Sequence, residues 1–416
     1  MTGPQDTPQG TARRTAGPLA GIKVLDLAHQ YAGALAGSMM ADFGADVVAV
    51  EHPNGNMVRT MLPLKDGTSL WWKVAGRGKR AITLKLSDPE GRELALKLAR
   101  EADVIIENFR PGTLERWQLG PADLEAAGVD AVMLRISGFG QTGRHRTRPG
   151  FGSVAEAMSG FAHLTGMPDG PPTFPSTTLA DGVTGTFGCL GVMAALTGKF
   201  RGVAPAGVQV VDASLVESLF RLIPTQVIGY DQLGLVPMRP GNFIGDHGVL
   251  RNLYESKDGV WFTASAVGAA TIRRILTTVS AEDLIPEIET TLASHDRDTL
   301  EGFFRRADDR VVAWAKERTY AEIDAALLAG GVVYERVYDI AAIYEDPFFT
   351  ERENIIDVKD VELGRVKMQG IAPKLPGYDL EVRHAGPSRG QDTEAVLGEL
   401  GLDAEEIAGL RERNVL

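Results

Sequence analysis

In this sequence of 416 residues, Asp181 is the residue whose type and position most clearly suggest a chemical role. It follows the polar triplet Ser176-Thr177-Thr178 and precedes a run without charge up to Lys199. That pattern predicts a helix buried on all sides, with Asp181 at or near its N-terminus. In one interpretation Asp181 is the N-cap, because its carboxylate accepts a hydrogen bond from a free backbone N–H. In the other, a partly shielded carboxylate beside backbone N–H groups is a nucleophile.

Glycine recurs at every third position of this predicted helix, at Gly182, Gly185, Gly188 and Gly191. Each glycine costs a helix about 0.5 to 1 kcal/mol relative to alanine. We therefore expect the helix backbone to lie against another helix or against a ligand that approaches Asp181.

The segment around Asp181 resembles the class III CoA-transferase family, which includes formyl-CoA transferase, carnitine CoA-transferases and α-methylacyl-CoA racemase. The resemblance covers residues 18–416. It rests on P-P-T-x-P-S-x-x-x-A-D-G-x-x-G around Asp181, G-V-Q-V-V-D-A-S-L-V-E-S-L over 207–219, E-N-F-R-P-G and S-G-F-G-Q-T-G. In the family's transferases the aspartate of this motif is the nucleophile, so the resemblance assigns that role to Asp181.

The activity implied is the transfer of CoA from an acyl-CoA donor to a carboxylic acid. Attack of the aspartate on the thioester gives a mixed anhydride, and an aspartyl-CoA thioester follows. This chemistry needs no tightly bound cofactor and no metal, because CoA and acyl-CoA are substrates. Alternatives are intramolecular CoA transfer within one diacid, racemisation or isomerisation of an acyl-CoA, and acyl-CoA binding without catalysis.

Residues of the CoA site follow from the same resemblance. Lys79 and Arg80 match the family's basic pair, Arg116 matches an arginine that contacts CoA, and Asn108 matches a residue near the acyl group. The predicted CoA-binding residues are His29, Lys79, Arg80, Asn108, Arg110, Arg116, Gly138 and Gly140.

Three further residues are predicted to contact the substrate. Tyr31 stands where formyl-CoA transferases carry glutamine, and Arg251 is a candidate clamp for an acceptor carboxylate. Phe151 occupies the position of the racemase histidine, and the lack of that base disfavours racemisation. Glu156 offers a second carboxylate, although a glutamate on a helix surface is the preferred interpretation.

The segment Gly138-Phe139-Gly140-Gln141-Thr142-Gly143 matches G-x-G-x-x-G after a predicted strand and so raises the possibility of an NAD(P)-dependent oxidoreductase. That fingerprint requires a helix to begin on the last glycines. Residues 144–149 are instead polar and end in proline. We therefore disfavour the nicotinamide interpretation, and the resemblance makes this segment a loop of the CoA and acyl site.

Apolar segments that alternate with helical segments predict an α/β fold with a doubly wound parallel sheet. The predicted strands lie at residues 22–27, 46–51, 81–86, 103–107 and 131–136. Ligand sites of such sheets lie at the carboxyl ends of the strands. His29, Tyr31 and Asn108 follow predicted strands, so we expect them near one another.

Chain length predicts more than one domain. We expect a disordered tail over residues 1–17, a large Rossmann-like CoA-binding domain over 18–225 and 331–416, and a small α+β domain over 226–330. The resemblance implies that the small domain is inserted into the large one and that two chains interlock as a homodimer.

Composition argues against several classes of partner and compartment. The net charge of −12 argues against nucleic acid. Residues 182–198 are apolar enough to suggest a membrane span, but their glycines and threonines favour a core helix. The single cysteine, Cys189, excludes an internal disulfide and suits a reducing compartment, so we expect a cytoplasmic enzyme without a metal.

Overall fold

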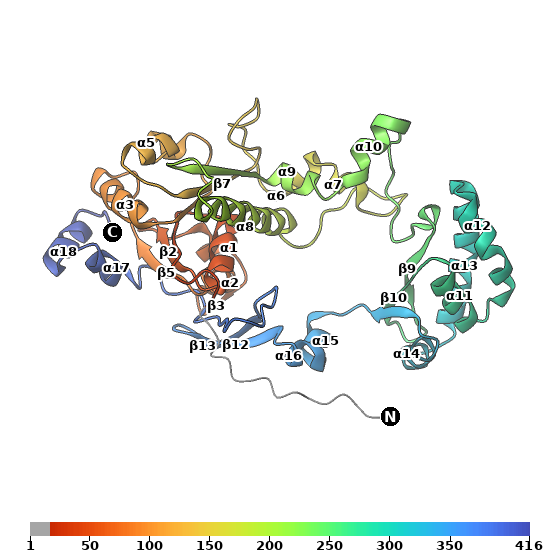
Figure 1. Ribbon diagram of the computed structural model, residues 1–416. Coiled ribbons are helices and arrows are strands. Elements are labelled where there is room, and N and C mark those ends of the chain that lie inside the picture. Colours follow the sequence, from red (N-terminus) through yellow and green to blue (C-terminus); the bar gives the residue numbers. More distant parts are fainter. Residues whose placement is uncertain (1–16) are drawn as a thin grey trace. The chain divides into compact units, whose positions relative to one another are not determined.

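The computed structural model describes residues 17–416, which form two compact units (Figure 1). The first unit comprises residues 17–161, Pro175–Thr225 and Phe348–Leu416. The second comprises Ala162–Phe174 and Gln226–Pro347. The predicted tail lies outside the described residues apart from its last position.

A six-stranded parallel sheet forms the centre of the first unit, in the order β5-β2-β1-β6-β7-β8. Its strands are β1 (Lys23–Asp26), β2 (Asp46–Glu51), β5 (Arg80–Thr83), β6 (Val104–Glu107), β7 (Val132–Ser137) and β8 (Gln209–Ser214). The predicted parallel α/β sheet is confirmed. The order runs outward from β1 and β6, so the carboxyl ends of these two neighbours border a natural crevice. The edge strand β8, which is partly exposed, was not among the predicted strands.

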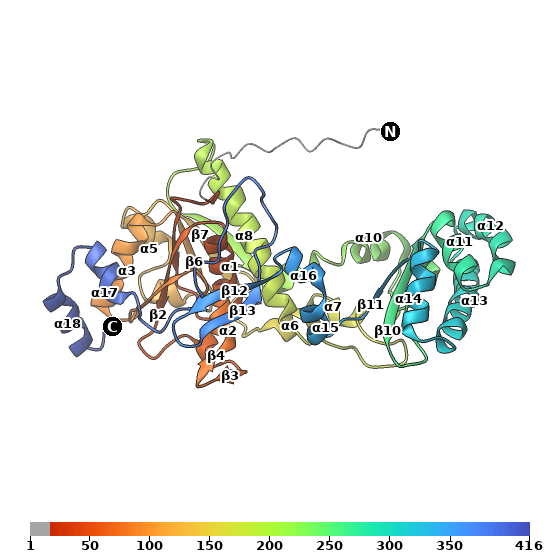
Figure 2. The ribbon, with the colours of Figure 1, turned by 90° about the horizontal axis from the view of Figure 1, so that it is seen from below.

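Helices cover both faces of this sheet, because alternate strand residues point to opposite sides. On one face, α1 (Tyr31–Asp42) and α8 (Leu179–Phe200) pack against strand residues such as Val24 and Ile106. On the other face, strand residues such as Leu25 and Ile105 pack against α3 (Pro89–Glu101), α5 (Pro121–Ala126), α17 (Thr393–Glu399) and α18 (Ala404–Glu412). Figure 2 shows α3 and α17 on one side of the strands and α8 on the other.

The glycines of α8 allow the close approach that their spacing predicts. A Cβ atom on Gly185 would lie 2.9 Å from the carbonyl oxygen of Ala32 in α1, and one on Gly191 would lie 2.6 Å from Val211 in β8. The predicted contact with another helix is confirmed, and the sheet is a second contact.

The expectation that this helix is buried on all sides is wrong. Leu190 is 64% exposed and Phe200 is 72% exposed, because only the side of α8 toward the sheet and α1 is covered. By length and composition alone, α8 is the one helix among the described residues that could cross a membrane.

Shorter elements complete the first unit. They are η1 (Met57–Thr60), β3 (Leu64–Lys65), β4 (Thr68–Ser69), α2 (Leu70–Ala75), α4 (Thr113–Arg116), α6 (Gly152–Met158), α9 (Leu215–Phe220), α16 (Pro347–Glu351), β12 (Ile355–Asp360) and β13 (Gly364–Gln369).

The second unit has its own core and a three-stranded antiparallel sheet in the order β11-β10-β9. Its elements are α7 (Phe161–Leu164), α10 (Pro224–Leu233), η2 (Gly245–His247), β9 (Val249–Glu255), β10 (Trp261–Val267), α11 (Ala269–Thr278), η3 (Glu282–Glu287), α12 (Ile288–Ser294), α13 (Arg297–Lys316), α14 (Tyr320–Ala329), β11 (Val333–Arg336) and α15 (Ile340–Glu345). The unit continues past residue 330, where the small domain was predicted to end, because β11 pairs with β10.

Candidate active site

Asp181 lies in the first turn of α8, where Thr178 occupies the N-cap position. The interpretation of Asp181 as the N-cap is therefore wrong. Among the described residues its carboxylate makes no side-chain hydrogen bond and no ion pair. A carboxylate that stabilised the fold would be expected to have such a partner, so Asp181 is free to meet a ligand.

A cavity of about 310 Å³ opens in front of Asp181. The loops that follow β1, β6 and β7 line it with Gln30, Arg110 and Gly138, and the start of α6 adds Phe151. These loops leave the carboxyl ends of three adjacent strands, which is where such a sheet is expected to bind its ligand.

Burial and, after it, the negative charge of Glu156 together raise the pKa of Asp181 to about 6. Glu156 lies in α6 and is only 5% exposed, so the interpretation of it as a helix-surface residue is wrong. Burial also raises the pKa of Glu156, while a hydrogen bond with the backbone of Ala180 opposes that rise. The start of α6 is close to Asp181, because a Cβ atom on Gly152 would lie 3.6 Å from its Oδ2.

Asn108 joins the two central strand ends. The backbone N–H of His29 donates to Asn108 Oδ1 at 2.9 Å, and Asn108 Nδ2 donates to the carbonyl oxygen of Gln30 at 3.1 Å. The side chain of Asn108 therefore holds the loop after β1 against the loop after β6. Its amide lines the cavity while it performs this positioning role.

His29 and Phe109 form a flat wall of the cavity. Their rings stack with centroids 4.6 Å apart and an interplanar angle of 14°. The Nδ1 atom of His29 is buried and has no hydrogen-bond partner, and burial lowers the pKa of the imidazole. A neutral imidazole with an unused nitrogen can donate to or accept from a ligand.

A second cavity of about 450 Å³ adjoins the first and shares His29, Met57 and Phe109 with it. Trp117 and the end of β2 also line this cavity. The two cavities lie next to each other along the carboxyl edge of the sheet.

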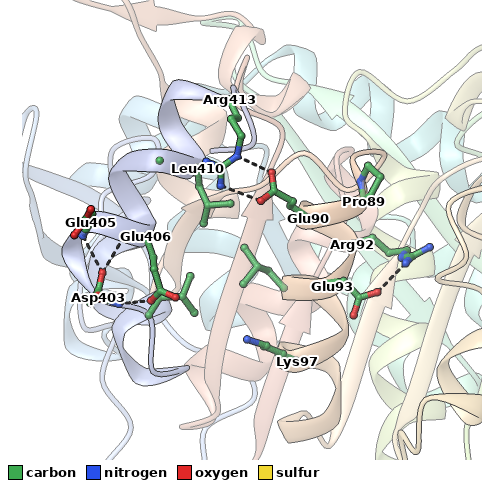
Figure 3. Close-up of a pocket in the computed structure, with 13 residues that line it drawn as sticks. Pro89, Glu90, Arg92, Glu93, Lys97, Asp403, Glu405, Glu406, Leu410 and Arg413 are labelled. Carbon is green, nitrogen blue, oxygen red and sulfur yellow. Dashed lines mark hydrogen bonds and ion pairs between the residues drawn. The ribbon is translucent and has the colours of Figure 1, made fainter.

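A larger hollow of about 670 Å³ lies between α3 and α18, away from the strand ends (Figure 3). Arg413, the C-cap residue of α18, bridges to Glu90 of α3 there, with nitrogen–oxygen distances of 2.8 and 2.9 Å, and Asp403 caps the N-terminus of α18. None of the predicted site residues lines this hollow. Volume alone therefore does not identify the site, and the chemistry of its lining makes the Asp181 cavity the candidate.

The prediction that Lys79 binds CoA is corrected by its burial. Lys79 Nζ lies 2.7 Å from Asp26 Oδ2 and donates to the carbonyl oxygen of Ala34 at 2.6 Å. The side chain is fully buried beneath α1. Its charge is already neutralised inside the fold, so no ammonium is left for a phosphate.

The prediction for Arg80 is corrected by its position. Arg80 begins β5 and forms ion pairs of 2.7 Å with Asp46, at the start of β2, and with Glu399 of α17. It therefore lies at the amino end of the sheet, whereas the Asp181 cavity lies at the carboxyl end.

Only some of the other predicted CoA contacts line a cavity. Arg110 and Gly138 line the Asp181 cavity. Arg116 is exposed outside both cavities, where it donates to the Gly112 carbonyl and to Thr113 Oγ1, both at 3.0 Å. Its neighbour Trp117 lines the second cavity.

Gly140 lies outside the Asp181 cavity and has a φ of 84°, a left-handed conformation that suits glycine. Its N–H donates to Ser137 Oγ at 3.0 Å, and the N–H of Gln141 donates to Asp212 at 2.9 Å. Residues 138–150 contain no helix, as expected, so the glycine loop does not form a dinucleotide-binding turn.

The three predicted substrate contacts lie in different places. Phe151 lines the cavity and is 59% exposed. Tyr31 begins α1 and packs edge-on against Trp71; burial and then the charge of Asp181 raise its pKa. Arg251 belongs to β9 of the second unit, so the first unit builds its cavity without it.

Two charged cavity residues were missed in the sequence, Arg146 and Arg148. The signal was the basic run over residues 144–148, directly after the glycine loop. It had served only as an argument against a dinucleotide fold.

Comparison with known proteins gives a consistent result. The family model described as CoA-transferase family III matches residues 19–393. Succinyl-CoA–D-citramalate CoA-transferase of Chloroflexus aurantiacus is 34% identical over 411 residues, covering 98% of this chain and 100% of that protein. The β subunit of succinyl-CoA–L-malate CoA-transferase of the same organism is 36% identical over 404 residues, covering 96% and 98%.

Solved structures agree on the fold. The crystal structure of a CAIB/BAIF family protein from Brucella suis superimposes with a TM-score of 0.78 at 27% identity, covering 93% of this chain and all of that one.

Proposed function

This chain belongs to CoA-transferase family III and is therefore an enzyme that transfers CoA, and we propose that Asp181 is its nucleophile. The observation that carries the proposal is the state of Asp181. Among the described residues that line the cavity it is the one acidic side chain, and it has no partner. A carboxylate with a raised pKa is a stronger base and so a better nucleophile than an ordinary one.

The proposed reaction begins when Asp181 attacks the thioester carbonyl carbon of the donor. The C–S bond breaks, CoA leaves as a thiolate, and a mixed anhydride remains on Asp181. The thiolate then attacks the aspartyl carbonyl and releases the donor acid as its carboxylate. This step leaves an aspartyl-CoA thioester.

The second half repeats these steps with the acceptor. Its carboxylate attacks the aspartyl thioester, which gives a new anhydride and frees the thiolate again. The thiolate attacks the acceptor carbonyl, so acceptor-CoA forms and Asp181 is regenerated. No net proton transfer is required. The reaction proceeds through reactive anhydride and thioester intermediates on Asp181 instead of one direct exchange between donor and acceptor.

The position of Asp181 supports this role electrostatically. Asp181 lies in the first turn of α8, where backbone N–H groups carry partial positive charge. These groups can stabilise the oxyanions that form at either carbonyl. With a pKa of about 6, Asp181 is mostly ionised at neutral pH.

We propose that CoA spans both cavities, with its thioester beside Asp181. The shared wall of His29 and Phe109 would follow the pantetheine arm. Arg110 and Arg116 follow β6 and form no ion pair with an acid among the described residues, so we assign them to the phosphates.

Racemisation fits the cavity less well. A racemase needs a second base on the far side of the α-carbon. Phe151 lines the cavity at the position of the racemase histidine and offers no base.

The proposed assembly is an interlocked homodimer of Rossmann-like large domains. The strand order is that of a doubly wound dinucleotide fold. Two helices present apolar side chains to solvent, Leu190 and Phe200 on α8 and Ile228 and Leu233 on α10. Exposed apolar surface of this kind marks a protein interface. Light scattering should give the mass of two chains.

The activity is tested by incubating the chain with succinyl-CoA and a panel of carboxylic acids. Succinyl-CoA is the first donor to use, because both relatives from Chloroflexus aurantiacus are named for it. Chromatography should detect a new acyl-CoA with the wild type and none with Asp181→Asn. Equal formation with both proteins would reject Asp181 as the nucleophile.

A further inference from the structure

The Asp181 cavity carries more positive charge than its nucleophile needs. Three guanidinium groups line it, from Arg110, Arg146 and Arg148. Among the described residues none of the three forms a hydrogen bond or ion pair with an acid. The three side chains are exposed and line the cavity, where a guanidinium can form strong, bidentate hydrogen bonds with a carboxylate or phosphate of a ligand.

Arg146 and Arg148 come from a different loop than Arg110. They lie between β7 and α6, on the segment that leads directly to the start of α6 beside Asp181. The guanidinium of Arg148 lies 5.4 Å above the Phe139 ring, and that ring packs against Gly150. Arg148 therefore contacts an aromatic ring of its own loop and also lines the cavity.

The anionic group near Asp181 is defined by the proposed chemistry. The acyl group must lie beside Asp181, while the CoA phosphates lie at the far end of the pantetheine arm. The second cavity, which would receive the remainder of CoA, has no lysine or arginine among its lining residues. Arg146 and Arg148 line only the cavity on the side of the acyl group, whereas Arg110 directly follows Phe109, which both cavities share.

We infer that Arg146 and Arg148 bind the free carboxylate of a dicarboxylic acyl group and thereby select donors and acceptors that carry two carboxyl groups. This inference rests on the proposed function for the placement of the thioester. Arg110 is left to CoA itself. A monocarboxylic acyl group would leave both guanidinium groups without their anion.

The test measures binding in an Asp181→Asn background, which stops turnover. Succinyl-CoA and butyryl-CoA are compared by calorimetry, because butyryl-CoA has a methyl group in place of the free carboxylate. The background protein should bind succinyl-CoA more tightly. Adding Arg148→Met or Arg146→Met should weaken succinyl-CoA binding about 10- to 100-fold, the loss typical of a charged hydrogen bond, and leave butyryl-CoA within about twofold.

Arg144→Met is the matched control. Arg144 is exposed on the same loop and outside the cavity, so its loss changes the net charge equally and should alter neither ligand. Equal weakening of both ligands by Arg146→Met and Arg148→Met would overturn the inference, since these residues would then bind CoA. Unchanged binding of both ligands, or no preference in the background protein, would also overturn it. A preference for succinyl-CoA without any CoA transfer by the wild type would reject the proposed function alone.

Discussion

Two groups of charges within the first unit behave in opposite ways. Among the buried residues, Lys79 is paired with Asp26 at 2.7 Å, and Arg135 is paired with Glu107 at 2.7 Å. In the Asp181 cavity, Asp181 and the arginines that line the cavity have no oppositely charged partner among the described residues. The first group links neighbouring segments of the sheet, and we propose that the second group binds the substrate.

The difference shows how the fold separates stability from function. Breaking a buried ion pair lowers the free energy of unfolding, because the remaining charge is left without a partner in a region of low dielectric constant. A partly buried charge without a partner, such as that of Asp181, costs stability in the free protein. It is retained where it acts on a substrate. The following predictions test this separation.

Replacement of Asp181 should cause the largest loss of activity. We expect Asp181→Asn to lower kcat at least about 10³-fold, as for other essential nucleophiles. The same change should not reduce the free energy of unfolding. Chromatographic assay of CoA transfer and urea unfolding measure the two quantities on one protein sample.

The pH dependence of stability sharpens this first prediction. Because folding raises the pKa of Asp181 to about 6, its ionised form destabilises the folded state at higher pH. Asp181→Asn should therefore increase the free energy of unfolding by roughly 1–3 kcal/mol at pH 8. The gain should fall as the pH drops below about 6 and disappear below about pH 3, where the carboxyl is protonated in both states. A loss of stability at pH 8 would mean that Asp181 has a structural partner.

Replacement of Lys79 should show the opposite pattern. Lys79→Met leaves Asp26 buried without its partner and should lower the free energy of unfolding by about 3–5 kcal/mol. The folded fraction should keep a KM for acyl-CoA close to that of the wild type. A raised KM with unchanged stability would restore Lys79 to the CoA site. The double variant with Asp26→Asn serves as the control and should recover part of the loss.

Replacement of Arg110 should give an intermediate effect on binding alone. Arg110→Ala removes a cation from the cavity and should raise KM about 10-fold for every CoA ester. The effect should be the same for succinyl-CoA and butyryl-CoA and should shrink at high salt. An effect confined to succinyl-CoA would move Arg110 into the group that binds the acyl carboxylate.

Replacement of Glu156 should cause the smallest change, in the pH profile. The negative charge of Glu156 contributes to the raised pKa of Asp181 after burial does, so Glu156→Gln should lower that pKa. The acid limb of kcat/KM should move to lower pH, while the limiting value at pH 8 changes little. An acid limb that does not move would place Glu156 outside the electrostatics of the nucleophile.

The sequence predicted well what depends on local pattern. Alternating apolar segments indicated the parallel sheet, and the glycine spacing of α8 indicated a close backbone contact. The gathering of His29 and Asn108 at strand ends followed from the topology of a parallel sheet. These features need only neighbours along the chain or a general rule of the fold.

The sequence could not reveal which charges are paired across the fold. Asp26, the partner of Lys79, lies 53 residues earlier in the chain. Glu156 looked like a surface residue because the packing of the short helix α6 onto α8 is a tertiary contact. Arg146 and Arg148 looked like ordinary surface charges until the cavity they line was visible. In each case the local sequence is the same for a structural, a surface and a functional charge.

The most direct test of the central claim is the chemical trapping of Asp181. The chain is incubated with succinyl-CoA, treated with hydroxylamine or borohydride, digested and analysed by mass spectrometry, with Asp181→Ala in parallel. We predict a modification on the peptide that contains Asp181, present only with the donor and absent from the variant. A donor-dependent modification at another residue, or CoA transfer without any modification of Asp181, would contradict the account.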